Sequence, residues 1–169
     1  GSRAEWVELS SAVETETGIR NVDSWSYDWV SGLRKAAVNY TFADGQVRTA
    51  LLQEAGTVDY IFGLDADKTV LGAEGGTATV AGTSSVTRLF NSISIENVTV
   101  PITDIAGTAA GFTVDSAART VTAASRGTQE GPERTVAIRG TAALDGRTLT
   151  STELVIHQGA NAVVSTTIG

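Results

Sequence analysis

Residues 36–64, AAVNYTFADGQVRTALLQEAGTVDYIFGL, decide the fold that we predict for this chain. Apolar side chains occupy every second position in three runs there: Val38, Tyr40 and Phe42, then Leu51, then Val58, Tyr60, Phe62 and Leu64. A period of two is the pattern of a strand that buries one face. Asp44 and Gly45 can take the positive φ of a tight hairpin, and Gly56 breaks the second run from the third. The stretch predicts a three-stranded antiparallel meander in the core.

The chain length of 169 residues fits one domain, which we expect over residues 3–169. Gly1 and Ser2 are expected to be a cloning remnant. Because Arg3 follows that remnant without a methionine, we expect that an upstream signal peptide or anchor helix was removed. No apolar run approaches the roughly 18 residues that a membrane span needs, so any membrane attachment is expected only through such an anchor.

Charge and cysteine content exclude several classes of partner and cofactor. The formal net charge is −7, which opposes binding to nucleic acid and to anionic membranes because both need a basic surface. The chain has no cysteine, so it forms no disulfide and no thiolate metal site. We therefore expect no cofactor, no metal and no nucleic-acid partner.

The N-terminal segment 4–17, AEWVELSSAVETET, has the periodicity of an amphipathic helix. Trp6, Leu9 and Val13 fall on one face of such a helix, and Gly18 is suited to end it. Two interpretations follow. The helix packs its apolar stripe on a sheet, or it is the remainder of a longer helix whose hydrophobic half was removed.

A row of aromatic residues follows in the strand predicted around residues 24–30. Trp25, Tyr27 and Trp29 alternate with polar residues, so the three rings share one face. Such a row serves either as a wall of the core or as a platform on which a ligand stacks. If the protein carries an apolar ligand in a small barrel, these three residues together with Tyr60 and Phe62 are the predicted lining.

The run at residues 86–102, VTRLFNSISIENVTVPI, is the longest strand-like stretch. Ile93 and Ile95 share one phase of the alternation, whereas Val98, Val100 and Ile102 share the other. A bulge near residues 96–97 explains this change of phase. Since Pro101 has no N–H to donate, this strand is expected to leave the sheet there or to lie at its edge, where another chain could pair with it.

The remaining segments complete a β-rich pattern. Strands are predicted around residues 69–71, 77–81, 112–115, 119–123, 135–144, 147–157 and 162–168. Asp145 and Gly146 mark a tight hairpin between two of them. The predicted fold is mainly β (α+β at the margin): an antiparallel, sandwich-like domain with one N-terminal helix (4–17) and a β region over 24–168.

Catalytic signatures are missing from the sequence. His157 is the only histidine, and no nucleophile motif such as G-x-S-x-G accompanies it. The D-x-D of Asp65 and Asp67 lacks the further acidic ligands of a calcium loop, so we interpret it as a solvated turn. No phosphate-binding glycine motif has the required spacing. We expect no catalytic residue and no enzyme activity.

Two sequons are candidate glycosylation sites. They begin at Asn39 (Asn-Tyr-Thr) and at Asn97 (Asn-Val-Thr). About one sequon arises by chance in a chain this rich in threonine, so the pair matters only if the protein reaches a compartment with glycosylation machinery.

These observations favour a structural or interaction module of an extracellular or cell-surface assembly in a prokaryote, working through protein partners or self-assembly. The order of a helix before a β-rich head resembles the layout of type IV pilins and related archaeal appendage proteins whose hydrophobic helix has been deleted. That resemblance implies an appendage subunit or surface-attachment domain. Two alternatives stay open: a small barrel-like carrier of an apolar ligand, and a structural protein of a virion tail or capsid.

Overall fold

The computed structural model describes residues 5–6, 25–41, 45–127 and 132–159. The chain forms strands in these residues, and they contain no helix. Most paired strands run antiparallel, with two short parallel exceptions, β1 with β4 and β6 with β15. The prediction of a mainly β, sandwich-like fold is confirmed.

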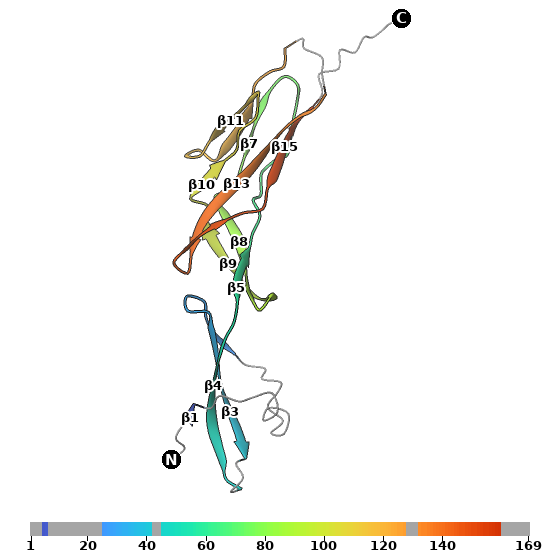
Figure 1. Cartoon of the computed structure of the whole chain (residues 1–169). Helices are drawn as coiled ribbons and strands as arrows, with labels where there is room; N and C mark the ends of the chain where they lie inside the picture. The colour runs from blue at the N-terminus through green and yellow to red at the C-terminus, as the bar shows by residue number, and fades with distance from the viewer. Residues whose placement is uncertain (1–4, 7–24, 42–44, 128–131, 160–169) are drawn as a thin grey trace, which may run out of the picture. The chain divides into compact units, whose positions relative to one another are not determined.

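The chain divides into two compact units (Figure 1). The first comprises residues 1–59 and 90–93, and the second comprises residues 60–89 and 94–169. The predicted single domain over 3–169 stays a prediction, because a division into compact units does not decide whether either unit folds alone.

The first unit contains a four-stranded sheet with the order β1-β4-β3-β2. Its strands are β1 (Glu5–Trp6), β2 (Ser26–Asp28), β3 (Leu33–Thr41) and β4 (Val47–Ala55). β3 and β4 pair antiparallel over their full lengths, and Gly45 between them has a φ of 82°. The hairpin predicted at this point is therefore confirmed, although Asp44 lies outside the described residues.

Two predictions for the first 64 residues need correction or stay open. Glu5 and Trp6 form a strand parallel to β4, so the predicted helix is wrong at these two residues. The rest of the helix, 7–17, lies outside the described residues. The third strand of the meander exists as β5 (Val58–Ile61), but it joins the sheet of order β5-β8-β9 and does not pair with β4. Strand periodicity gives no information about the neighbour, which explains this error.

The second unit is built from strands in three sheets. Besides part of β5, it contains β8 (Thr83–Phe90) except Phe90 and β9 (Ile93–Pro101) except Ile93. The other strands are β6 (Val70–Leu71), β7 (Gly76–Thr79), β10 (Asp104–Ala106), β11 (Phe112–Asp115), β12 (Thr120–Ala123), β13 (Arg134–Leu144), β14 (Arg147–Thr150) and β15 (Leu154–Gln158). One sheet has the order β10-β13-β15-β6, with β14 also paired to β13, and another has the order β11-β12-β7.

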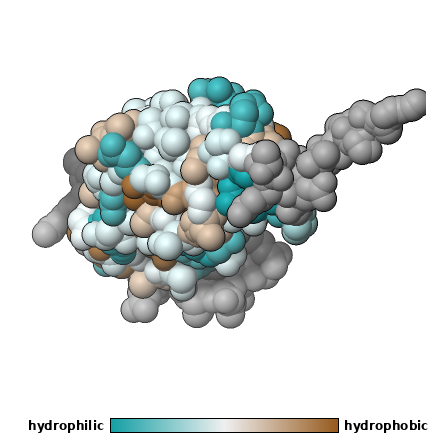
Figure 2. All heavy atoms as spheres, turned by 90° about the horizontal axis from the view of Figure 1, so that it is seen from above, coloured by the Kyte–Doolittle hydropathy of each residue, from teal (hydrophilic) through white to brown (hydrophobic). Residues whose placement is uncertain are grey.

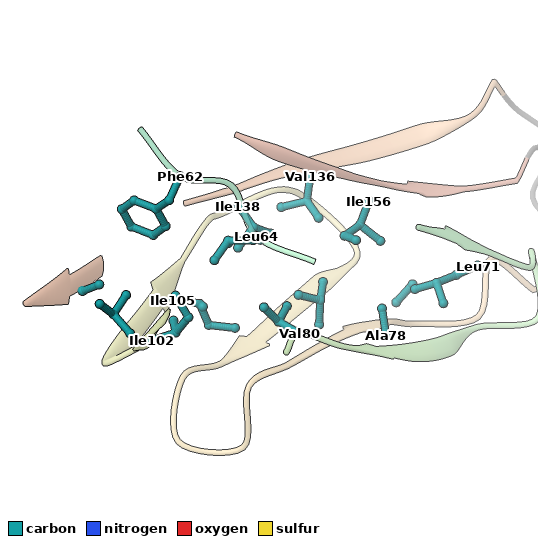
Figure 3. Close-up of a cluster of buried hydrophobic side chains, with 14 of the residues drawn as sticks. Phe62, Leu64, Leu71, Ala78, Val80, Ile102, Ile105, Val136, Ile138 and Ile156 are labelled. Carbon is teal, nitrogen blue, oxygen red and sulfur yellow. The ribbon is translucent and has the colours of Figure 1, made fainter. Parts of the chain in front are cut away.

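The core of the second unit lies between these sheets. Figure 3 shows Val136, Ile138 and Ile156 pointing from β13 and β15 toward Ala78 and Val80. All five side chains are at most 2% exposed. Burying this apolar surface stabilises the unit, at roughly 25 cal/mol for each Å² removed from water.

β13 organises its sheet because it pairs with β10, β14 and β15. Its side chains alternate between buried and exposed through most of its eleven residues, as a strand covered on one face requires. Gly140 continues the buried series, and a Cβ there would lie 2.5 Å from Cδ2 of Leu64. Leu64 therefore packs directly on the backbone of β13, and any side chain at position 140 would displace it.

The stretch 86–102 forms a hairpin of β8 and β9 and not the predicted single strand. Asn91 and Ser92 turn the chain, with φ values of 51° and 66°. Two consecutive positive φ angles are typical of a type I′ turn. The change of phase is confirmed, because two exposed residues, Glu96 and Asn97, separate the half-buried Ile95 from Val98. Pro101 ends β9, as predicted.

The hairpin at Asp145 and Gly146 is confirmed, with φ values of 53° and 74°. The strand predicted over 147–157 is two strands, β14 and β15, which pair with different parts of β13. Ser151 lies between them, and its Oγ accepts a hydrogen bond from the N–H of Gly140 at 2.8 Å. The strands predicted around 69–71, 77–81, 112–115 and 119–123 are confirmed as β6, β7, β11 and β12. The strand predicted over 162–168 lies outside the described residues.

Replacing Ile156 by alanine should destabilise the second unit strongly. Ile156 is 0% exposed, and removing a buried isoleucine side chain costs about 2–5 kcal/mol through lost burial and the cavity left behind. Val155, its neighbour on β15, is 37% exposed, so Val155→Ala should cost about 0.5 kcal/mol or less. Urea unfolding followed by far-ultraviolet circular dichroism measures both changes.

The same experiment tests the prediction of one domain. The three tryptophans, Trp6, Trp25 and Trp29, all belong to the first unit. If the chain unfolds as one cooperative domain, Ile156→Ala shifts the tryptophan fluorescence transition together with the circular dichroism transition. A fluorescence transition that stays in place would contradict a single domain.

Candidate functional site

Two residues of the predicted aromatic row are in contact in the first unit: Tyr27 on β2 and Trp29 in the turn that follows it. The rings of Tyr27 and Trp29 are stacked, with centroids 5.0 Å apart and planes 11° from parallel. Phe90 meets both rings edge-on, at 5.3 Å from Tyr27 and 6.4 Å from Trp29. Trp29 is 7% exposed and Phe90 1% exposed. These contacts favour the interpretation of the row as a wall of the core.

Arg34 on β3 adds a charge to this cluster. Its guanidinium lies 4.2 Å from the ring centre of Trp25 and 5.2 Å from that of Phe90. Glu54 on β4 accepts two hydrogen bonds from Arg34, one from Nε at 3.0 Å and one from Nη2 at 2.7 Å. Arg34 is held at its charged end by Glu54 while its flat face lies against the rings, which is a favourable cation–π arrangement.

A turn and a close backbone contact hold the cluster. The Oδ1 atom of Asp28 accepts hydrogen bonds from the N–H groups of Val30 and Ser31, both at 3.2 Å, and these bonds, with that of Ser31 first, lower the pKa of the Asp28 carboxyl. A Cβ at Gly56 would lie 2.4 Å from the ring of Phe90, so glycine is needed where this ring packs.

The other two predicted lining residues, Tyr60 and Phe62, belong to the second unit. Phe62 is 4% exposed and is part of the hydrophobic core of that unit. Tyr60 packs against the same core, and its hydroxyl is hydrogen-bonded. The five residues therefore do not all lie in one unit, and the pocket for an apolar ligand stays a prediction.

The hydroxyl of Tyr60 belongs to a polar network that the sequence did not reveal. Tyr60 donates to Oδ2 of Asp145 at 2.7 Å and accepts from Nη1 of Arg147 at 2.7 Å. Arg88 donates to both oxygens of Asp145, from Nε at 3.0 Å and from Nη2 at 2.5 Å. Glu96 lies 3.3 Å from Nη1 of Arg88. The network connects β5, β8 and β9 to the β13–β14 hairpin.

Burial and charge shift the pKa values of this network. Burial, followed by the hydrogen bond to Asp145, raises the pKa of Tyr60 to about 12. Burial also raises the pKa of Asp145, but the hydrogen bonds from Arg88 and Tyr60 and the nearby positive charges outweigh burial, and this pKa lies below its usual value. Asp145 is therefore ionised and Tyr60 neutral over the physiological pH range. In these protonation states the network can hold the connected strands together.

The other candidate residues lie apart from this network. His157 on β15 has its Nδ1 2.6 Å from a carboxylate oxygen of Glu133. Asp67 accepts a hydrogen bond from the N–H of Thr79 at 2.7 Å, as a residue that shapes a turn does. In the described part of the chain, no three histidine or acidic side chains are grouped as metal binding needs. No helix within the same residues could cross a bilayer.

The two sequons lie in different units. Asn39 is in β3, and its side chain is outside what the structure describes. Asn97 is exposed on β9, and its Oδ1 accepts a hydrogen bond from the hydroxyl of Thr87 at 2.8 Å. Glycosylation at either position stays a prediction.

β9 is the outer strand that offers the longest edge in the second unit. β8 lies in the middle of the sheet of order β5-β8-β9, so β9 pairs on one side only among the described strands. It has nine residues, whereas the outer strands β6, β7, β10, β11 and β14 have four or fewer. A long outer strand presents a row of N–H and C=O groups with which another chain can pair. Within the stretch 86–102, residues 93–101 therefore form an outer strand, whereas residues 86–90 belong to the central strand β8; pairing of another chain with this edge stays a prediction.

Apolar side chains are scattered over the rest of the surface. Figure 2 shows one face on which small brown areas are separated by pale residues of intermediate hydropathy. The exposed large apolar residues outside the first sheet are Ile61 on β5, Ile93 at the start of β9, and Val70 and Val155 on the paired strands β6 and β15. Contacts of the second unit through main-chain groups therefore have more support than contacts through one apolar patch.

Comparison with known proteins leaves the family open. No family model and no curated protein matches this sequence.

Replacing Asp145 by asparagine should destabilise the second unit. Arg88 and Asp145 have side chains only 15% and 10% exposed, and the change removes the carboxylate that accepts two hydrogen bonds from this guanidinium, so that only the more exposed Glu96 still pairs with it. We expect a loss of about 1–3 kcal/mol in the free energy of unfolding. As a matched control, Glu153→Gln removes the exposed pair of Arg139 and Glu153, 3.2 Å apart, and should cost about 0.5 kcal/mol or less.

The destabilisation by Asp145→Asn should depend on pH. Since the folded pKa of Asp145 is lowered, its contribution is complete above the unfolded value of about 3.9 and is lost as the pH falls below it. The unmodified protein and Asp145→Asn should therefore approach equal free energies of unfolding in acid. An equally large difference at all pH values would contradict this role of the charge.

Tyr60 should titrate well above the ordinary pKa of a tyrosine. Its neutral form stabilises the folded chain fully below about pH 10, the unfolded value, and this contribution is lost as the pH rises toward 12. Alkaline titration followed by tyrosinate absorbance should show one group with a pKa of about 12 that is missing in Tyr60→Phe. A titration curve unchanged by the substitution would exclude the assignment.

Proposed function

We propose that this protein is a non-catalytic structural or interaction module of an extracellular assembly, such as an appendage subunit or a surface-attachment domain. The observation that carries the proposal is β9, a nine-residue outer strand in a unit whose other outer strands are short. A partner that pairs with this strand gains affinity from main-chain hydrogen bonds. Such recognition needs no diagnostic side chains.

β9 has features that limit non-specific pairing of other strands with its edge. A flat, apolar outer strand causes aggregation, and natural proteins prevent this with charges, prolines and bulges. β9 carries Glu96, ends at Pro101 and changes phase near Asn97. These features limit indiscriminate pairing and leave the rest of the nine-residue strand open to a specific partner.

The extracellular location rests on composition. Strands rich in threonine, valine and glycine, joined by tight hairpins and without cysteine, are common in exposed β-modules of prokaryotic surfaces. A net charge of −7 also suits a solvated surface.

The main chain of β9 can be blocked at Ser94. In a two-residue hairpin the residues flanking the turn exchange both main-chain hydrogen bonds, and such pairs alternate along the strands with pairs whose N–H groups face away. Phe90 and Ile93 flank the turn of Asn91 and Ser92, so the N–H of Ser94 is expected to face the open side of β9. Ser94→Pro removes this donor at a strand edge, where proline is tolerated. Ser94→Thr keeps it.

Photo-crosslinking in the cells that make the protein tests the proposal. A photo-reactive residue in place of Thr99, exposed on β9, should form an adduct with another polypeptide in the extracellular fraction. The adduct should fall several-fold with Ser94→Pro and persist with Ser94→Thr. The control position is Thr122, exposed on β12, which is paired on both sides. Equal adducts at both positions, or no effect of Ser94→Pro, would count against the proposal.

A further inference from the structure

We infer that the partner of β9 is residues 162–168 of a second copy of this chain, which add one strand to the β5-β8-β9 sheet. The inference rests on the proposed function, because it names the occupant of the same edge. Two independent observations carry it: the chemistry of this segment, and the separation between β9 and the end of β15 within one copy.

The segment AVVSTTI has the chemistry of an added strand. It contains valine, threonine and isoleucine, which favour strands, and it has no glycine, no proline and no charged residue. Its length is comparable with that of β9, so main-chain pairing can extend over most of the edge. An uncharged strand also avoids repulsion between like charges at Glu96, the only charge on β9.

The register of β13 separates β9 from the end of β15. Gln158, the last residue of β15, pairs with Arg134, whereas Asp104, just after β9, pairs with Thr141. Arg134 and Thr141 are seven residues apart on one strand, which is about 23 Å.

This separation favours pairing between copies. From Gln158 the fully extended chain reaches about 14 Å by residue 162. Residue 162 of one copy therefore falls short of its own β9, and pairing along the whole segment requires a neighbour. A contact between one end of a copy and the other end of the next is heterologous, and unless it closes into a ring it continues as an open filament.

Engineered cysteines test the contact in the full chain, because the protein has no cysteine of its own. One protein carries Thr99→Cys, and a second carries a cysteine at one of the positions 163–167 in turn. The two are mixed under mild oxidation, and mass spectrometry measures disulfides between unlike chains. Thr122→Cys, on the doubly paired strand β12, replaces Thr99→Cys as the control for random collision.

We expect disulfides from Thr99→Cys to exceed those from Thr122→Cys several-fold. Adding Ser94→Pro to β9 should reduce them, and so should Val164→Pro in the segment, which leaves every described strand unchanged. Sedimentation velocity of the unmodified chain should show oligomers that grow with concentration and are lost with Val164→Pro.

Two results would overturn the inference. One is a yield from Thr99→Cys no greater than that from Thr122→Cys. The other is a double variant, with Thr99→Cys and a cysteine at 163–167 in one chain, that closes only within a single copy at high dilution and high concentration alike. Either result leaves the proposed function standing if Thr99 still crosslinks to a different polypeptide in cells. If that crosslink is absent as well, the proposed function fails separately.

Discussion

The second unit depends on a single constraint, the register of β13. This strand pairs with β10, β14 and β15, so one choice of which face is buried fixes the orientation of three neighbours. A shift by one residue would move Val136 and Ile138 from the core to solvent, and would expose the backbone of Gly140 that Leu64 covers. The remaining sheets pack on the face that this register presents.

Local sequence chemistry predicts the strands and several turns, but not the neighbours. Asp145 and Gly146 mark a type I′ turn because aspartate and glycine accept positive φ readily. The turn at Asn91 and Ser92 has the same backbone shape but lacks glycine, so the strand pattern continues across it without a visible break. β5 is correctly predicted as a strand, whereas a period of two does not indicate its pairing with β8.

The candidate sites show the same division between local and distant information. Trp25, Tyr27 and Trp29 lie close together in the sequence, and their alternation with polar residues predicts a shared strand face. Only Tyr27 lies in β2, but the ring of Trp29 stacks on that of Tyr27. Tyr60, Arg88 and Asp145 come from three separate strands or turns, and nothing in the local sequence connects them. A network of this kind forms only when long-range pairing brings the elements together, so local patterns do not predict it.

The parallel pair of β6 and β15 has a consequence for the order in which the protein forms. Val70 and Leu71 pair with His157 and Gln158. This side of the sheet therefore cannot form until almost the last described residues have been synthesised. During synthesis, from the N-terminus onward, the β8–β9 and β11–β12 hairpins can close early, because their strands are adjacent in sequence. The edge at β6 cannot close until β15 has emerged from the ribosome. Until then the apolar side chain of Leu71 lacks its final cover, and the nascent chain is most exposed to aggregation and to chaperones.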